Sequence, residues 1–430
     1  MFRTSKSIIA LLVCIVSIAM HGQAQLVEQN LAPNIATIQL YQYGNQLELP
    51  VYTIGSAERI SLEFDDLNCG LKNYYYTYQL CDYNWKPVDL NPFDYIKGFT
   101  QNRINTYRYS SLAYTRYTHY QAILPEQNST PTRSGNYLLE VFLDGDRRKP
   151  VFTKQMLVLE AKSTISAEVV QPFSANLFST HQKLRFTASA PDLNSFSAAQ
   201  QVKAVILQNN RWDNAQRDIA PTFVRGNSLQ YDTETSSIFP GGKEWRWLDL
   251  RSFRLQSDRI DHADYGKAET KIYVKPDIDR RPQKYVYFAD INGMFVNTTY
   301  ESINPFWQGD YATVQFSFVT PDGKPLPNED LYLAGMFTGY RLTDQWKMQW
   351  NDSAHMYMGS TFMKQGYYNY AYIAVDKNDP KKATMLEGDY WETENSYTIL
   401  LYYKSFTDRT DRLIGLASIN SRRDRPGFSF

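Results

Sequence analysis

Histidine and cysteine are scarce in this chain, which has 5 His and 3 Cys among 430 residues. Cys14 lies in an apolar N-terminal run, so Cys69 and Cys81 are the thiols of the remaining chain. Two thiols without a nearby His cannot complete a tetrahedral zinc site. The sequence therefore predicts no metal site and no cofactor. In an oxidising compartment Cys69 and Cys81 are enough for one disulfide, and two buried free thiols are the alternative.

Charge of one sign is not in excess either, because 45 Lys and Arg balance 45 Asp and Glu. A neutral chain offers no electrostatic footprint for nucleic acid or for an anionic membrane surface. The motifs G-x-S-x-G, H-E-x-x-H and G-x-G-x-x-G are missing. The neighbouring carboxylates Asp65 and Asp66 are better explained as a solvated turn than as a catalytic or calcium site. These absences predict a protein that is not an enzyme and binds no nucleic acid.

Long apolar runs are missing except at the N-terminus. Residues 8–20 are almost wholly apolar, follow the basic residues Arg3 and Lys6, and precede the small-x-small segment of residues 22–24. This pattern is typical of a secretory signal peptide, which we place at residues 1–24. The run is shorter than the roughly 20 residues that a spanning helix needs. We therefore expect an exported protein without direct membrane insertion.

The chain is instead rich in aromatic residues, since 33 Tyr, 23 Phe and 8 Trp make up 15% of it. Tyr and Phe favour the half-buried surface of a pleated sheet. Apolar and polar residues alternate with period two in many segments, and Ile60, Leu62 and Phe64 show the pattern clearly. No helical run longer than about ten residues carries a clean apolar stripe. The pattern predicts an all-β fold of immunoglobulin-like or fibronectin-like β-sandwich domains in tandem.

Three blocks of predicted strands divide the chain after the N-terminal segment. We expect an N-terminal β-sandwich at residues 26–160, a second β domain at residues 165–293 and an immunoglobulin-like domain at residues 296–430. The expected strands of the second and third blocks are residues 183–190, 201–208, 244–249, 270–275, 284–289, 311–319, 331–337, 368–375, 397–403 and 413–419.

Several long segments appear in a specific order. They are residues 62–67 (LEFDDL), 74–85 (YYYTYQLCDYNW), 95–99 (YIKGF), 117–120 (YTHY), 134–139 (SGNYLL), 208–214 (QNNRWDN) and 239–244 (FPGGKE). Together they resemble the plug proteins of the type IX secretion system, from about residue 30 to the end of the chain. Leu80 departs from the family pattern where His is expected, and Cys69 departs where an acidic or small residue is usual. The second departure makes a Cys69–Cys81 bridge a local feature at best.

The resemblance implies a non-enzymatic protein of the periplasm at the inner face of the outer membrane. Plug proteins dock on the periplasmic opening of the outer-membrane translocon barrel and close it when no substrate is passing. The resemblance thus implies a monomer bound to a secretion barrel as its partner. It carries over no contact residues.

One loop offers candidate contact residues for such a partner. Residues 82–99 combine aromatic residues with Pro and Asn, which indicates a long loop rather than a strand. Trp85, Tyr95 and Phe99 are the candidate anchors, because aromatic residues dominate interface energetics. The alternative is that these three side chains pack beneath their own loop.

A second, looser resemblance suggests a different function. Residues 332–340 and 364–370 are similar to immunoglobulin-like glycogen-binding modules. On this alternative the protein is a periplasmic glycan-binding β-sandwich protein, with Tyr340, Trp346 and Trp350 as a stacking platform. Burial of these side chains in the core is the competing interpretation.

Overall fold

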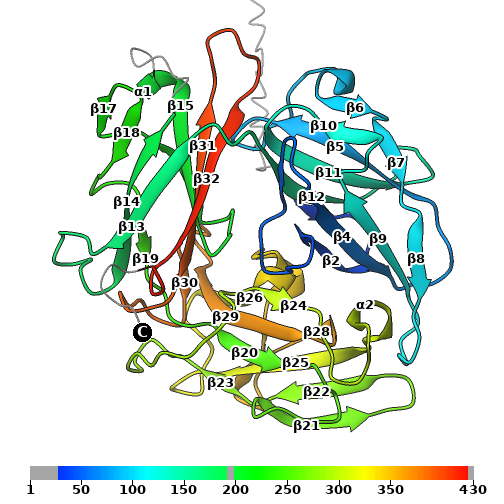
Figure 1. Ribbon diagram of the computed structural model, residues 1–430. Helices are drawn as coiled ribbons and strands as arrows, with labels where there is room; N and C mark the ends of the chain where they lie inside the picture. The colour runs from blue at the N-terminus through cyan, green and yellow to red at the C-terminus, as the bar shows by residue number, and fades with distance from the viewer. Residues whose placement is uncertain (1–27, 191–197, 425–430) are drawn as a thin grey trace, which may run out of the picture.

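Strands supply almost all of the regular secondary structure. In the computed structural model, which describes residues 28–190 and 198–424, they form three β lobes that meet at a common centre (Figure 1). The α-helices of these residues are the four-residue segments α1 (Ala198–Gln201) and α2 (Pro305–Gln308). The predicted all-β class is confirmed. The predicted signal peptide, residues 1–24, lies outside the described residues.

The first domain, residues 28–160, is a sandwich of two sheets with a short ribbon beside them. One sheet has the order β1-β12-β11-β5-β7 with β3 parallel to β12, the other has the order β2-β4-β9-β8, and β10 pairs with β6. The elements are β1 (Gln29–Asn30), β2 (Ile35–Gln42), β3 (Val51–Thr53), β4 (Ile60–Asp66), β5 (Tyr74–Cys81), η1 (Pro92–Asp94), β6 (Ile96–Gly98), β7 (Gln101–Arg103), β8 (Thr106–Tyr109), β9 (Thr118–Leu124), β10 (Ser129–Pro131), β11 (Gly135–Leu143) and β12 (Pro150–Leu159).

Aromatic side chains fill the space between these two sheets. Phe64 from one sheet meets Tyr74 of the other edge-on, with ring centroids 5.1 Å apart, and it stacks on Tyr120 at 5.2 Å. Tyr76 and Tyr78 continue the inward face of β5 and are buried as well. The high tyrosine content is therefore used mainly inside the protein, where each ring removes a large apolar area from water.

The second domain is a sandwich that the chain completes only near its C-terminus. Its sheets have the orders β13-β14-β18-β17, with β19 also on β14, and β16-β15-β31-β32. The strands are β13 (Thr164–Val170), β14 (His181–Ser189), β15 (Val202–Gln208), β16 (Gln216–Ile219), β17 (Phe223–Arg225), β18 (Ser228–Tyr231), β19 (Ile238–Pro240), β31 (Ser396–Tyr403) and β32 (Arg412–Asn420).

The third domain consists of residues between those two parts of the second. Its sheets have the orders β20-β29-β24, with β26 and β30 also on β29, and β21-β22-β25-β28-β27, with β23 on β25. The elements are β20 (Arg246–Asp249), β21 (Ile260–Tyr265), β22 (Thr270–Val274), β23 (Asp277–Ile278), β24 (Phe295–Val296), β25 (Tyr311–Val319), β26 (Glu329–Ala334), η2 (Met336–Thr338), η3 (Asp344–Trp346), β27 (Gln349–Asn351), β28 (Met356–Lys364), β29 (Tyr367–Asp376) and β30 (Ala383–Met385).

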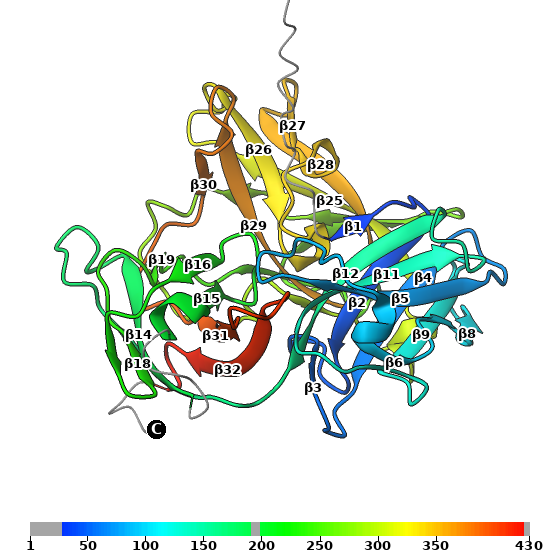
Figure 2. The same ribbon diagram turned by 90° about the horizontal axis from the view of Figure 1, so that it is seen from above.

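The predicted division into residues 165–293 and 296–430 is wrong. β15 and β31 pair side by side over their whole length, so the last two strands belong to the second domain (Figure 2). The prediction grouped strands that are consecutive in sequence, which are spatial neighbours only about two-thirds of the time. The expected strand at residues 284–289 is also wrong, because this segment forms no strand. It runs along the boundary between the second and third domains, where the Tyr285 hydroxyl donates to the Glu244 carboxylate at 2.7 Å and to the Glu392 carbonyl at 3.0 Å.

The two chain crossings between the second and third domains lie side by side. The carbonyl of Gly242 accepts the backbone N–H of Tyr390 at 3.0 Å and the hydroxyl of Thr393 at 2.8 Å. A Cβ on Gly241 would clash with the Tyr390 carbonyl, and Gly242 has φ +65°. The two glycines of the FPGGKE segment are therefore needed where the chain leaves one domain and returns to it.

The second domain also covers the outer face of the first domain's β1-β12-β11-β5-β7 sheet. Leu138 and Leu157 on that face pack in one cluster with Leu207, Leu400 and Leu413 of the second domain. The outer face of this sheet is therefore covered around Leu138 and Leu157, whereas Glu140 and Thr153 farther along the same face are partly exposed. The two sandwiches are thus joined by a continuous apolar core.

The nested order of the domains makes a direct prediction. Replacing residues 243–389 by a two-residue Gly-Ser linker should leave the second domain folded, because the residues at the two crossings are already hydrogen-bonded to each other. Far-ultraviolet circular dichroism and a cooperative thermal transition would measure this. A chain cut after Asp389 is the control and should lose the second domain's transition, since β15 loses β31. Unchanged cooperative unfolding of that shortened chain would contradict the arrangement.

Candidate functional site

The loop of residues 82–99 packs partly against its own domain and partly against the second domain. The carboxylate of Asp82 accepts the backbone N–H groups of Asn84 and Lys86 at 2.9 and 2.8 Å, which closes a tight turn. Phe93 lies farther along the loop and is exposed, although no sequence pattern marked it as a contact residue.

Two of the three predicted anchors are buried, so the prediction is wrong for them. Trp85 is 3% exposed and meets Trp212 of the second domain edge-on, with ring centroids 4.8 Å apart. Tyr95 is 1% exposed, and its hydroxyl donates to the carbonyl of Tyr78 at 3.3 Å. Both rings contribute to packing inside the molecule, where a partner cannot reach them. Phe99 is 64% exposed and stays a candidate contact residue.

The proposed glycan platform loses its first member. The guanidinium of Arg211 covers the ring of Tyr340 at 4.6 Å, and Trp245 meets the same ring edge-on at 6.0 Å. The Tyr340 hydroxyl donates to the carbonyl of Gly293 at 3.0 Å. Tyr340 therefore lies in the contact between the second and third domains, and Arg211 already occupies a face that a sugar would need.

Trp346 and Trp350 are both half-buried and lie against different neighbours. Trp346 packs edge-on against Phe337 at 5.9 Å, whereas Trp350 packs against Tyr357 at 5.1 Å. The Trp350 indole N–H donates to Asp352 at 2.8 Å. The three residues thus have separate packing roles, and sugar stacking on the two tryptophans stays a prediction.

The disulfide between Cys69 and Cys81 is not formed, and both thiols are free. Cys69 lies before the start of β5, where Thr118 approaches its sulfur at 3.9 Å. Cys81 is buried at the other end of β5, an eight-residue strand. Such a strand spans about 24 Å at about 3.4 Å per residue. A disulfide needs Cα atoms within about 7 Å, so the two positions are too far apart.

A cluster of charged side chains is buried where the first domain meets the third. Both imidazole nitrogens of His119 are hydrogen-bonded at 2.7 Å, one to Asp65 and the other to Glu63. Lys364 of the third domain reaches the second oxygen of Asp65 at 2.5 Å, and the Tyr311 hydroxyl donates to the same oxygen at 2.6 Å. Asp65 is therefore a buried interdomain residue, and the predicted solvated turn is wrong for it.

These contacts determine the charge states in the cluster. Burial raises the pKa of Asp65, but Lys364 and His119 outweigh burial and hold that pKa below its usual value. Burial lowers the pKa of His119, yet its hydrogen bonds to Asp65 and Glu63 raise it overall. The cluster is shielded from water, since its four charged side chains are at most 4% exposed; they are Glu63, Asp65, His119 and Lys364. It joins two domains and is closed to a substrate.

A second charged cluster lies inside the third domain. Arg246 reaches Asp277 at 2.8 Å and Glu387 at 2.9 Å. The hydroxyls of Tyr370 and Tyr372 donate to the other oxygen of Asp277 at 2.8 and 3.0 Å. Burial alone would lower the pKa of Arg246, but the two carboxylates raise it. The carboxylates of Asp277 and Glu387 are thus also paired with groups inside the protein.

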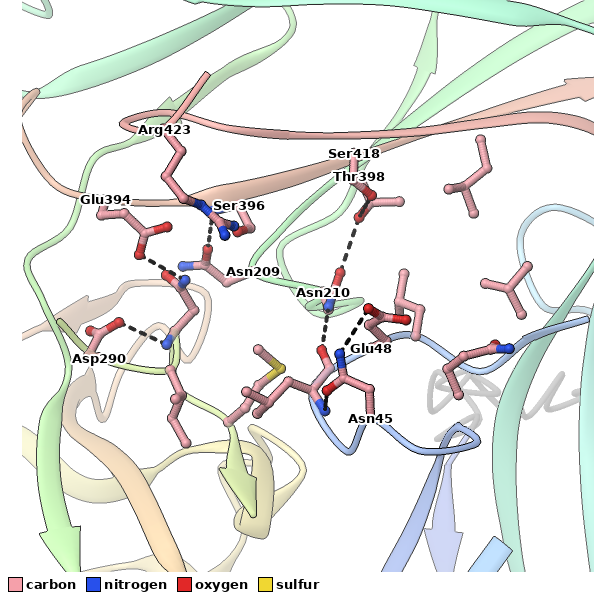
Figure 3. A pocket seen from close by; sticks show the side chains of 18 of the residues that line it. Asn45, Glu48, Asn209, Asn210, Asp290, Glu394, Ser396, Thr398, Ser418 and Arg423 are labelled. Atoms are coloured by element: carbon pink, nitrogen blue, oxygen red, sulfur yellow. Dashed lines mark hydrogen bonds between the residues drawn. The ribbon is translucent and has the colours of Figure 1, made fainter. Parts of the chain in front are cut away.

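The three domains line a partly open cavity of about 1160 Å³ (Figure 3). The side chain of Asn210 joins its walls, because it donates to the carbonyl of Leu47 at 3.5 Å and accepts from Thr398 at 3.1 Å. Asn209 likewise accepts the backbone N–H of Ser396 at 2.9 Å. The amide and hydroxyl groups that line the second domain's wall therefore hold the chain together at this junction.

The third domain contributes Asp290 to the same cavity. Burial raises the pKa of Asp290 to about 7, against the effect of backbone N–H groups from Asn292 and Trp245, and Glu394 adds to the rise. The residues that line the cavity include hydroxyl side chains but neither His nor Cys. Asp290 can hold or release a proton near neutral pH, and it accepts the backbone N–H groups of Trp245 and Asn292 within the third domain.

Two absences apply to residues 28–190 and 198–424. Within them, His, Cys, Asp and Glu side chains do not come together in any group that could hold a metal ion. In the same part of the chain, no helix combines the length and the apolarity that crossing a membrane requires.

Comparison with known proteins bears on the first domain most directly. Residues 35–160 match the model of the type 9 secretion system plug protein first domain. The predicted resemblance is confirmed over that range, and it relates the chain to type IX secretion plug proteins. No curated protein matches the chain in a sequence search.

The whole fold recurs in a protein of known structure. The chain is similar to the crystal structure of a hypothetical protein from Parabacteroides merdae ATCC 43184, with 27% sequence identity and a TM-score of 0.86. The alignment covers 91% of this chain and 98% of that one. The structural similarity therefore extends beyond residues 35–160, to all three domains, including the nested third one.

The segments that carry the family resemblance lie mostly at domain contacts. The Tyr83 hydroxyl of the first domain donates to Asp218 of the second at 2.6 Å. Asn136 accepts the hydroxyl of Tyr402 at 2.7 Å across the same boundary. Lys243, in the FPGGKE segment, donates to the backbone carbonyls of Arg280 and Gln283 in the third domain. These segments thus supply contacts that hold the first domain, and the other two, in their relative positions.

The buried interdomain ion pair predicts a large effect of a single substitution. Lys364→Met should lower the free energy of unfolding by about 3–5 kcal/mol, because it leaves Asp65 charged and buried without its main partner. Urea unfolding followed by tryptophan fluorescence would measure it. Lys271→Met is the matched control, since Lys271 pairs with Glu269 on the surface and should leave the midpoint unchanged. Equal effects of the two substitutions would contradict a buried role for Lys364.

The raised pKa of His119 predicts a specific pH dependence. Because the pKa is higher in the folded protein, protonated His119 stabilises the fold fully below its ordinary value of 6.5. That stabilisation is lost as the pH rises through the folded pKa. The stability difference between wild type and His119→Gln should therefore shrink from pH 6 upward in urea titrations. The exposed His262→Gln variant should follow wild type at every pH, and a His119→Gln difference that grows with pH would refute the assignment.

Proposed function

We propose that this protein is a periplasmic plug of the type IX secretion system. It binds the periplasmic opening of the outer-membrane translocon barrel and closes that opening while the barrel is idle. The observation that carries the proposal is the match of residues 35–160 to the first domain of plug proteins.

The way the domains are joined supports this function. A wide barrel leaves an aqueous lumen that solutes cross unless something fills its mouth. A stopper must therefore keep its shape against thermal motion of its parts. The apolar core shared by the first and second domains and the buried Asp65–Lys364 pair between the first and third both resist such motion.

The distribution of chemical groups supports a role without catalysis. The buried carboxylates and the imidazole of His119 are bonded to protein groups and are shielded from solvent. The family match likewise relates the chain to plug proteins, for which a structural rather than a catalytic role is expected. We therefore propose a non-enzymatic protein that acts as a monomer bound to the barrel, at the inner face of the outer membrane.

A reversible stopper needs an interface that forms and dissolves. Such interfaces have a few aromatic or apolar anchors within a polar rim. Phe99 is the one predicted anchor with an exposed ring. Its neighbour Phe93 is exposed as well, so this loop offers two rings that a partner can reach.

Affinity purification would test the proposal. A tagged chromosomal copy, purified from detergent-solubilised envelopes, should bring the translocon barrel with it. Deleting the protein should make cells more sensitive to antibiotics too large for ordinary porins, because an unplugged barrel leaks. The barrel's absence from the purified material, together with unchanged sensitivity of the deletion strain, would refute a plug function.

A further inference from the structure

Large apolar side chains are exposed where the first domain meets the third. Leu112 and Tyr114 lie at the tip of the β8–β9 hairpin, and they are 77% and 85% exposed. Tyr300 and Ile303 lie just before α2 and are 62% and 99% exposed. The hairpin tip and α2 are side by side (Figure 1). We call these four residues the seam patch.

Hydrogen bonds between the two domains hold the seam patch in place. The carboxylate of Asp310 accepts the backbone N–H groups of Tyr114 and Thr115, both at 3.0 Å. The backbone N–H of Ser111 donates to the carbonyl of Trp307, in α2, at 2.8 Å. The exposed side chains therefore project from a backbone that is already ordered, which lowers the entropy cost of binding a partner.

The backbone at the hairpin tip is also strained. Leu112 has φ +66°, a left-handed conformation that is uncommon for a residue with a Cβ. Strain of this kind persists where the surrounding structure enforces it, and it clusters at binding sites. Here it directs a leucine side chain outward into water, where the side chain contributes nothing to the protein's own core.

Arginines without partners border the seam patch. Arg108 and Arg116 come from the hairpin and Arg254 from the loop beside Tyr300; all three are exposed and form no ion pair with the described residues. Two carboxylates lie nearby: Asp310 accepts from the hairpin backbone, and Glu301 accepts from Ser252 and Gln365. Three arginines against these two carboxylates leave a small excess of positive charge on this face.

We propose that the seam patch is the surface that docks on the barrel, and that its occupants are the short strand-connecting turns of the barrel's periplasmic rim. This inference rests on the proposed plug function. Barrels of this kind have short periplasmic turns, and turns are rich in Asp, Asn and Gly. An acidic, small-residue rim complements apolar anchors bordered by Arg108, Arg116 and Arg254.

The inference separates this face from the loop that carries Phe99. Phe99 follows β6, and β6 lies at the opposite end of the first domain from the β8 hairpin tip (Figure 1). The proposed docking face takes its contacts from the first and third domains together.

Binding of full-length protein variants to the purified translocon barrel would test the inference. Leu112→Ser combined with Ile303→Ser should weaken binding about tenfold or more, because it removes two central anchors. Arg108→Glu combined with Arg116→Glu should weaken binding most at low salt, since it reverses the sign of the rim. The controls are Phe173→Ser and Phe223→Ser, which remove exposed rings of the second domain and should leave binding within about twofold of wild type.

The outcomes separate this inference from the function on which it rests. All variants should keep the wild-type melting temperature, because every substituted side chain is exposed. If wild type binds the barrel and the seam variants bind equally well, or if Phe99→Ser alone abolishes binding, the seam patch is not the docking face while the plug function stands. If wild type itself does not bind the barrel, both the function and the docking face are wrong.

Discussion

The ion pair between Asp65 and Lys364 is the contact on which the three-domain arrangement depends most. Both side chains are almost fully buried, so each would be costly to keep charged without the other. His119 and Tyr311 bond to the same carboxylate from two different domains, which leaves little freedom to tilt one domain against the other. A charged cluster of this kind specifies one relative orientation, because a shift of even 1–2 Å (roughly the tolerance of a hydrogen bond) would break several bonds together.

The second constraint is the order in which the chain builds the domains. β31 and β32, which complete the second sandwich, follow the third domain in the sequence. The two crossings, at Gly242 and Tyr390, are hydrogen-bonded to each other. The third domain is therefore tied to the second at both of its ends and to the first through Lys364. Contacts at these two boundaries make a body that bends little, which suits the proposed plug function.

The same constraint explains where the exposed apolar residues occur. Most of the aromatic rings pack inside the sandwiches or between them, as Trp85 does against Trp212. The seam patch is different because its backbone is fixed by hydrogen bonds while its side chains contact water. A residue such as Ile303, at 99% exposure, adds almost nothing to folding, and the docking proposed for the seam patch would give it a use in binding.

The sequence by itself determined the fold class, the inward faces of strands such as β5, and the kinship of the first domain, because period-two patterning and long ordered segments are local properties. The sequence did not reveal that β31 pairs with β15, since the apolar pattern of a strand does not specify which distant strand it pairs with. It also misjudged Trp85, Tyr95 and Asp65, whose surroundings come from residues far away in sequence. Only the tertiary structure decided which loop residues are buried and which reach solvent, because burial depends on what the neighbouring domain covers.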